Sequence, residues 1–176
     1  MDDTPQNTGD DTVGNDEPTR KISHDRVFLV VLDDTPEMQA ALTYAARRVR
    51  NSGGRLALLY VIEPAEIEPW MSVGDLIREE RRQEAETAVG KFSEATAAIT
   101  GQLPVLYIRD GRRREEIIKL IDEEPSISIL VLAAGTGPDG PGPLVNHLVG
   151  KVASKMRVPI TVVPGNLSDE EIERLT

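Results

Sequence analysis

The residues with the clearest potential for chemistry lie in a glycine- and proline-rich loop at residues 135–143. This loop follows an apolar run at residues 129–132 and precedes a segment of helical spacing that opens near Leu144. Such a turn between a strand and a helix lets backbone N–H groups approach an anion at the positive end of the helix dipole. The loop therefore predicts a phosphate site. The alternative is that its residues only turn the chain sharply, as glycine and proline also do in proteins that bind nothing.

Other residues of chemical interest give weaker signals. The pair Gly150-Lys151 resembles the end of a Walker loop, but the earlier glycine would fall at Val145 and the next residue is Val152 rather than Ser or Thr. His24 and His147 are far apart and have no metal-ligand partner at helical spacing, so no metal site is predicted. His147 lies near the loop, where it either touches a phosphate or is an ordinary surface or boundary histidine.

Two further clusters leave alternatives open. Arg112, Arg113 and Arg114 are either a solvated basic patch, which we favour, or a site for an anionic ligand or the carboxylates of a partner. Trp70 and Met71 follow the second apolar run. They form a flap over a ligand, pack at a subunit contact or anchor the loop to the core.

The composition limits the classes of protein. The chain has 20 Lys+Arg against 30 Asp+Glu and a net charge of −10, which argues against general affinity for nucleic acid or anionic membranes. It has no cysteine, no apolar run approaching the roughly 20 residues that span a bilayer, and an acidic start without a secretory pattern. We expect a soluble, cytoplasmic protein.

The acidic residues are concentrated at the N-terminus. Six carboxylates and no basic residue occur up to Glu17, with hardly an apolar side chain among them. Such a segment cannot bury enough surface to offset its chain entropy. We predict a disordered acidic tail at residues 1–22, which is solvated or serves as an interaction arm, and one folded domain at residues 23–176.

The rest of the chain alternates apolar runs with helical patterns. Continuous apolar runs predict strands at residues 27–32, 56–62, 105–108, 129–132 and 160–163. Helical spacing predicts helices at residues 36–52, 75–100, 112–124, 144–156 and 168–175, with Thr35 and Ser168 as N-terminal caps. This alternation predicts an α/β fold, an open five-stranded parallel sheet with helices on both faces.

Sheets of this kind bind ligands beyond the carboxyl ends of strands, where the strand order reverses. Asp33 follows the first strand, and the glycine-rich loop follows the fourth. If these two strands are neighbours, Asp33 and the loop lie together at such a switch point. That arrangement favours a nucleotide-sized anionic ligand.

Three segments together resemble the universal stress protein family. The segment at residues 27–35 is similar to the family's first strand ending in Asp-Gly-Ser or a near variant, residues 58–64 to its second strand, and residues 158–164 to its closing strand. The resemblance covers about residues 24–164. It implies the Rossmann-like, adenine nucleotide alpha hydrolase-like fold.

The resemblance also implies a nucleotide site. Members that bind ATP carry Gly, two residues, Gly, nine residues and then Gly followed by Ser or Thr. Here the spacing is met with Lys151 in the hydroxyl position, Asp33 would contact the adenosine part, and Val61 would line the adenine pocket. Aligned from the strand instead, the first glycine falls near Ala133 and the loop is about four residues longer than the pattern. The implied site residues are Leu32, Asp33, Val61, Gly137, Gly140, Gly150 and Lys151.

These residues imply a stress-response module that binds ATP, with Mg²⁺, or AMP as a regulatory ligand and forms a homodimer through the edge of the fifth strand. One alternative is a homodimeric protein-interaction module that no longer binds nucleotide. Another is an ATP-using hydrolase or transferase, in which Asp33 would hold a metal nearly alone. Because no general base is positioned beside a nucleophile, any ATP hydrolysis should be slow.

Overall fold

The computed structural model describes residues 26–64 and 71–176. The predicted acidic tail and the predicted flap residue Trp70 lie outside these ranges. The elements in chain order are β1 (Val27–Val31), α1 (Met38–Ser52), β2 (Arg55–Ile62), α2 (Met71–Thr100), β3 (Val105–Asp110), α3 (Arg113–Glu123), β4 (Ile127–Ala134), α4 (Pro143–His147), the π-helical segment η1 (Leu148–Val152), the 3₁₀ segment η2 (Ala153–Lys155), β5 (Ile160–Pro164) and α5 (Asp169–Leu175).

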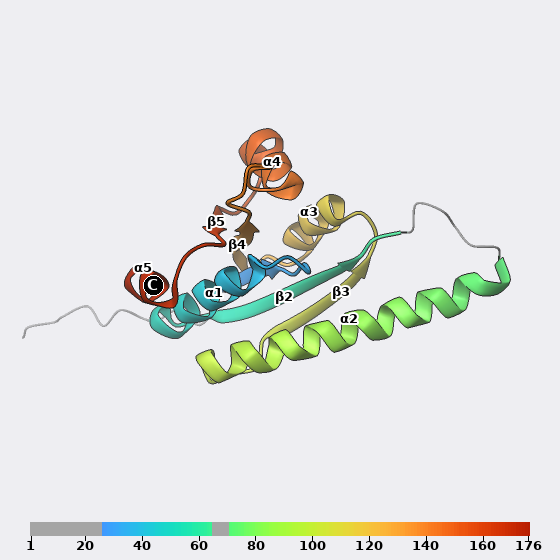
Figure 1. Cartoon of the computed structure of the whole chain (residues 1–176), viewed down its shortest axis with the longest axis horizontal. Helices are drawn as coiled ribbons and strands as arrows, with labels where there is room; N and C mark the ends of the chain where they lie inside the picture. Colours follow the sequence, from blue (N-terminus) through green and yellow to red (C-terminus); the bar gives the residue numbers. More distant parts are fainter. Residues whose placement is uncertain (1–25, 65–70) are drawn as a thin grey trace, which may run out of the picture.

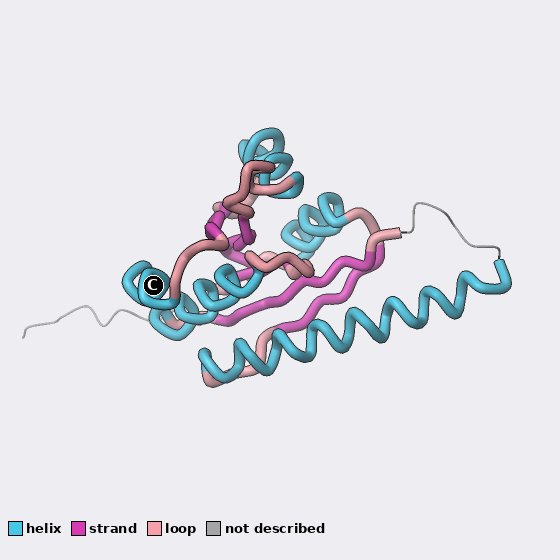
Figure 2. Tube along the Cα trace, in the orientation of Figure 1, coloured by secondary structure: helices cyan, strands magenta, loops and turns pink. Residues whose placement is uncertain are grey.

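The five strands form one parallel sheet in the order β3-β2-β1-β4-β5 (Figures 1 and 2). The chain builds outward from β1 to β3 and then returns to the other side of β1 for β4 and β5. The predicted fold class is confirmed, and the first and fourth strands are neighbours, which is the condition that the sequence analysis left open. The strand order therefore reverses between β1 and β4.

Two apolar layers cover the two faces of the sheet. On one face, side chains of β1, β2 and β4 pack against α1, α2 and α5, with Val89 and Ile172 as buried contacts from the last two helices. On the other face, they pack against α3 and the α4–η1 segment through Ile117, Leu120 and Leu148. All five residues of β1 are buried, because helices lie on both sides of this central strand.

The helix α2 is much longer than the strands beside it. Its 30 residues span about 45 Å at 1.5 Å per residue, whereas the eight residues of β2 span about 27 Å. The Met71 end of α2 consequently extends past the sheet (Figure 1). The sequence predicted a start at Asp75, and the observed start at Met71 places that residue in the helix rather than in a loop.

One predicted helix cap is wrong and the other is confirmed. Thr35 does not cap α1, because its hydroxyl and N–H both donate to Asp33, and the helix begins at Met38 with Glu37 at the N-cap position. At α5, Ser168 accepts a hydrogen bond from the Glu171 N–H, and the Glu171 carboxylate accepts one from the Ser168 N–H. This capping box fixes the start of α5.

The predicted helix at residues 144–156 is divided into α4, η1 and η2. The π-helical part is the segment that contains Gly150 and Lys151. None of the helices in residues 26–64 and 71–176 is long and apolar enough to cross a membrane.

Candidate functional site

The candidate site lies at the switch point between the carboxyl ends of β1 and β4. Val31 pairs with Leu59 of β2, and Val30 pairs with Val131 of β4. Leu32 extends the pairing with β2 by donating its N–H to the Leu59 carbonyl, and Asp33 comes directly after it. The glycine-rich loop starts directly after β4, at Gly135, and Val61 lies near the end of β2. These three predicted features therefore lie at the carboxyl ends of three neighbouring strands.

Asp33 is held in place by the residues that follow it. Its Oδ1 accepts hydrogen bonds from the Thr35 N–H at 3.0 Å and from the Thr35 hydroxyl at 2.5 Å. This side chain-to-backbone turn competes with the capping role predicted for Thr35. It presents a fixed, half-buried carboxylate at the switch point. A carboxylate only accepts hydrogen bonds, so it suits hydroxyl groups such as those of ribose.

The two hydrophobic residues implied for the site are core residues. Leu32 is 1% exposed and donates its N–H to the Leu59 carbonyl at 2.8 Å. Val61 is 2% exposed and lies in the layer that faces α3 and α4. Their side chains belong to the two different core layers, Leu32 on the α1 face of the sheet and Val61 on the α3 face.

The glycine-rich loop folds back on itself. The Gly140 N–H donates to the Gly137 carbonyl at 3.1 Å, closing a turn around Pro138 and Asp139. Gly140 has φ +78°, a left-handed conformation that favours glycine. A Cβ added to Gly135 would lie 2.9 Å from the Gly140 carbonyl oxygen. The Gly140 N–H therefore serves the turn of the loop, and the Gly140 carbonyl oxygen lies close to the end of β4.

Gly137 has open space around its Cα, with nothing within 4 Å of an added Cβ, and the same holds for Gly140 and Gly150. Gly150 and Lys151 lie in η1, beyond the five residues of α4, and both are exposed. The structure thus puts Asp33, Val61 and the loop start at or near the carboxyl ends of the neighbouring strands β1, β2 and β4. It places Gly150 and Lys151 farther along the helical segment that follows the loop.

Glu37 is a residue of this region that the sequence pattern did not single out. It lies near the start of the helix predicted at residues 36–52, and its side chain lies against Gly165, directly after β5, and near Gly135, directly after β4. The carbonyl of Ala134 accepts the Gly165 N–H at 2.9 Å, which holds these two strand ends together. Glu37 and Gly165 are far apart in sequence, so no local pattern contains this contact.

The carboxyl ends of β2 and β3 are joined by ion pairs. The Glu63 carboxylate accepts the Arg113 N–H at 3.2 Å and lies 3.6 Å from the Arg113 guanidinium. Arg112 pairs with Glu115 of its own helix at 3.4 Å. Two arginines of the predicted cluster therefore have different contacts: Arg113 binds Glu63, just after β2, and Arg112 binds Glu115 nearby in the chain. Beside it, burial and then the charge of Asp34 raise the pKa of Tyr60.

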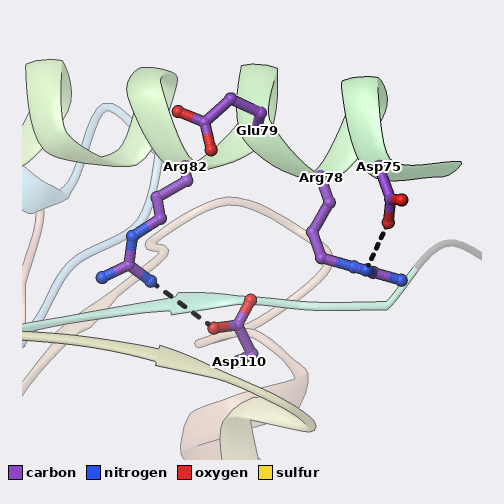
Figure 3. A pocket seen from close by; sticks show the side chains of 5 residues that line it. All are labelled: Asp75, Arg78, Glu79, Arg82 and Asp110. Carbon is purple, nitrogen blue, oxygen red and sulfur yellow. Dashed lines mark hydrogen bonds and ion pairs between the residues drawn. The ribbon is translucent and has the colours of Figure 1, made fainter.

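A separate cavity of about 420 Å³ lies between the start of α2 and the end of β3 (Figure 3). Its lining is charged: Asp75, Arg78, Glu79, Arg82 and Asp110. Arg78 pairs with Asp75 at 3.0 Å, and Arg82 lies 3.8 Å from Asp110. These charges largely compensate one another. In the described part of the chain, no three carboxylate, histidine or cysteine side chains gather where they would hold a metal ion.

The parallel strand order and its reversal beside β1 define an open α/β protein with a Rossmann-like fold. Residues 26–164 match the model of the universal stress protein family. The chain belongs to this family, a family of stress-response modules. No curated protein matched the chain.

Solved structures agree on the fold. The universal stress protein UspA from Lactobacillus plantarum has 19% identity and a TM-score of 0.64, over 80% of this chain and 99% of the other. A universal stress family protein from Burkholderia pseudomallei has 16% identity and a TM-score of 0.58, over 81% and 98%. The Archaeoglobus fulgidus protein, solved in complex with dAMP, has 15% identity and a TM-score of 0.55, over 78% and 97%. At these identities the likeness concerns the fold.

Proposed function

We propose that this protein is a cytoplasmic stress-response module that binds an adenine nucleotide, AMP or ATP with Mg²⁺, as a regulatory ligand. One observation carries the proposal: β1 and β4 are neighbours in the sheet, with Asp33 just after the end of β1 and the glycine-rich loop directly after β4. Ligands of open α/β sheets bind at such points. A similar fold from Archaeoglobus fulgidus was solved with dAMP, which supports the choice of an adenine nucleotide.

Each part of the proposed site has a physical role. The Asp33 carboxylate, oriented by Thr35, accepts hydrogen bonds from the adenosine hydroxyls. The open space at Gly137 and Gly140 lets the loop backbone approach the phosphates. Lys151 is exposed and reaches a phosphate as a flexible point charge. Val61 supplies apolar surface on the α3 face of the sheet, Leu32 supports the end of β1 from the other face, and Gly150 leaves the helix surface open.

We also propose a homodimer through β5. The strand order puts β5 at one edge of the sheet. The outer backbone N–H and C=O groups of an edge strand can form hydrogen bonds with another chain. Val162 on this strand is 36% exposed. Two copies joined by this edge would cover it symmetrically. Sedimentation equilibrium of the full chain at micromolar concentration tests this part of the proposal, and a monomer contradicts it.

Calorimetric titration tests nucleotide binding. The wild-type chain and the variant Asp33→Asn are titrated with AMP and with ATP, each with and without Mg²⁺. Asparagine keeps an oxygen for Thr35 and removes the charge, so we expect about tenfold weaker binding, the scale of one lost hydrogen bond to a charged group. Asp34→Asn, at an exposed neighbour, is the matched control and should bind as the wild type does.

A specific observation favours one other function. The glycine-rich loop uses the Gly140 N–H for its own turn, and Lys151 stands where the family has a hydroxyl. Both features suit a dimeric interaction module that no longer binds nucleotide. If calorimetric titration detects no heat of binding at millimolar AMP and ATP, the result favours the interaction module over the nucleotide-binding module. Steady phosphate release from ATP would instead indicate an enzyme.

A further inference from the structure

Glu37 occupies a cradle formed by two glycines at the switch point. A Cβ added to Gly165 would lie 2.6 Å from the Cβ of Glu37 and 2.9 Å from its Cα. The Glu37 Oε1 lies 3.5 Å from the position of a Cβ at Gly135. Because the start of α1 comes this close to the chain after β5, only glycine fits at residue 165. The Glu37 side chain is therefore fixed across the ends of β4 and β5.

This placement gathers oxygen atoms beside the loop. The Gly140 carbonyl oxygen lies 2.9 Å from the position of a Cβ at Gly135, the point that the Glu37 carboxylate also approaches. Asp33 lies one strand away at the end of β1. The part of the loop nearest the sheet therefore presents acceptors and negative charge, whereas a phosphate requires donors or positive charge.

The nearby positive charges are placed less favourably. Lys151 is exposed and lies in η1, eight positions beyond the start of α4 at Pro143. His147 is half-buried at the end of α4. In the described part of the chain, neither residue forms an ion pair with Glu37.

The geometry points to Glu37 as the residue that sets which phosphate group this site accepts: its carboxylate disfavours free triphosphate relative to monophosphate or nucleoside. This inference rests on the proposed nucleotide site. Repulsion grows with the charge of the phosphate chain, so metal-free ATP is disfavoured most and adenosine not at all. Mg²⁺ neutralises part of the charge of ATP and restores part of its affinity.

The test is a calorimetric comparison of wild type, Glu37→Gln and Asp34→Asn with adenosine, AMP and ATP. Glutamine preserves the shape of the side chain and removes its charge. We expect Glu37→Gln to tighten metal-free ATP binding about tenfold and AMP binding about threefold, and to leave adenosine unchanged. In the presence of Mg²⁺, the increase in ATP affinity caused by Glu37→Gln should fall to about threefold. Asp34→Asn removes an equal charge from an exposed neighbour and should have little effect.

The outcomes separate the inference from the function on which it rests. If the wild type binds these ligands but Glu37→Gln changes all three equally, or Asp34→Asn has the same effect, the role of Glu37 is overturned and the site stands. Weaker binding of Mg²⁺-ATP to Glu37→Gln also overturns it, because the carboxylate would then hold the metal. If neither wild type nor variant binds any of the three, the nucleotide site itself is overturned.

A second measurement on the wild type does not depend on the variant folding. Repulsion between the site and a phosphate chain is screened by salt, so ATP affinity should rise as NaCl increases from about 20 to about 200 mM. Adenosine affinity should stay constant over the same range. A fall of ATP affinity with salt would show net attraction at the phosphate end and would overturn the inference.

Discussion

The two halves of the carboxyl edge of the sheet are built by different means. Beside the β1/β4 switch point, at the ends of β4 and β5, chain segments approach so closely that glycine is the only residue that fits, as at Gly165 against Glu37. At the ends of β2 and β3, charged side chains bridge wider gaps, as between Glu63 and Arg113. Close backbone packing fixes positions to fractions of an ångström, whereas exposed ion pairs tolerate movement.

This difference explains why the candidate site lies at one half and not the other. A ligand site needs groups held in a fixed geometry. Asp33 and Glu37 are held by a local turn and by a glycine cradle, respectively. By contrast, Arg78 and Arg82 of the charged cavity have exposed side chains on the part of α2 that extends toward Met71. The following predictions test this contrast, from the largest expected effect to the smallest.

Gly165→Ala should have the largest effect. The new Cβ would lie 2.2 Å from the Cγ of Glu37 and 2.9 Å from its Cα, and the Cα cannot move without shifting the start of α1. We expect a loss of about 2–3 kcal/mol in the free energy of unfolding, measured by urea denaturation. The matched control is Gly90→Ala in α2, where nothing lies within 4 Å of an added Cβ.

Gly90→Ala should raise the free energy of unfolding by about 0.5–1 kcal/mol, because alanine favours a helix interior over glycine. The same chemical change thus has opposite signs at the two sites. Similar losses at both positions would mean that the contact between Glu37 and Gly165 does not constrain the fold.

Arg109→Met should have an intermediate effect at the end of β3. The Arg109 guanidinium lies 2.6 Å from Glu123 and 3.5 Å from Glu116, and the Glu116 side chain is only 14% exposed. Removing Arg109 leaves Glu116 partly buried without its closest positive partner. We expect a loss of about 1–2 kcal/mol at neutral pH, measured by urea denaturation. Lys119→Met, which removes an exposed partner 3.9 Å from Glu116, is the control and should cost less than about 0.5 kcal/mol.

The effect of Arg109→Met should also depend on pH. The hydrogen bond from Arg109 lowers the pKa of Glu123 below its usual 4.5 in the folded state. A carboxyl group with a lowered folded-state pKa stabilises the fold above its unfolded-state pKa and loses that contribution as pH falls through the folded-state value. The difference in the free energy of unfolding between wild type and Arg109→Met should therefore become smaller as pH falls below 4.5. If this difference does not change with pH, the charges of Arg109 and Glu123 do not stabilise the fold.

The sequence predicted the elements of the site better than their contacts. The five strands and the place of Asp33 at a strand end followed from apolar runs, which are local patterns, whereas the adjacency of β1 and β4 was left as a condition. Ser168 was correctly predicted as a cap because its partner Glu171 is three residues away. Thr35 was not, since its N–H and hydroxyl both donate to the Asp33 carboxylate two residues before it, and the helix starts later, at Met38.

The role of Glu37 had no signal in the sequence. Its contacts are with Gly135 and Gly165, which join it only after the sheet has formed. Gly165 is a single glycine after a proline, a pattern that also occurs in ordinary turns. The placement of Gly150 was equally hidden, because helical spacing does not distinguish an α-helix from the π-helical segment found there. Long-range close approaches of this kind must be taken from the structure.

Arg82→Gln should have the smallest effect. The Arg82 guanidinium lies 3.8 Å from Asp110, and the two side chains are 50% and 60% exposed. Pairs of this kind contribute little, because solvent screens them and ordering both side chains costs entropy. We expect the free energy of unfolding to change by less than about 0.5 kcal/mol. Nucleotide affinity should be unchanged, because β3 is separated from β1 by β2, a distance of about 10 Å across the sheet. A loss of nucleotide affinity without a loss of stability would place part of the ligand in the charged cavity, and the division between the two halves of the sheet edge would not hold.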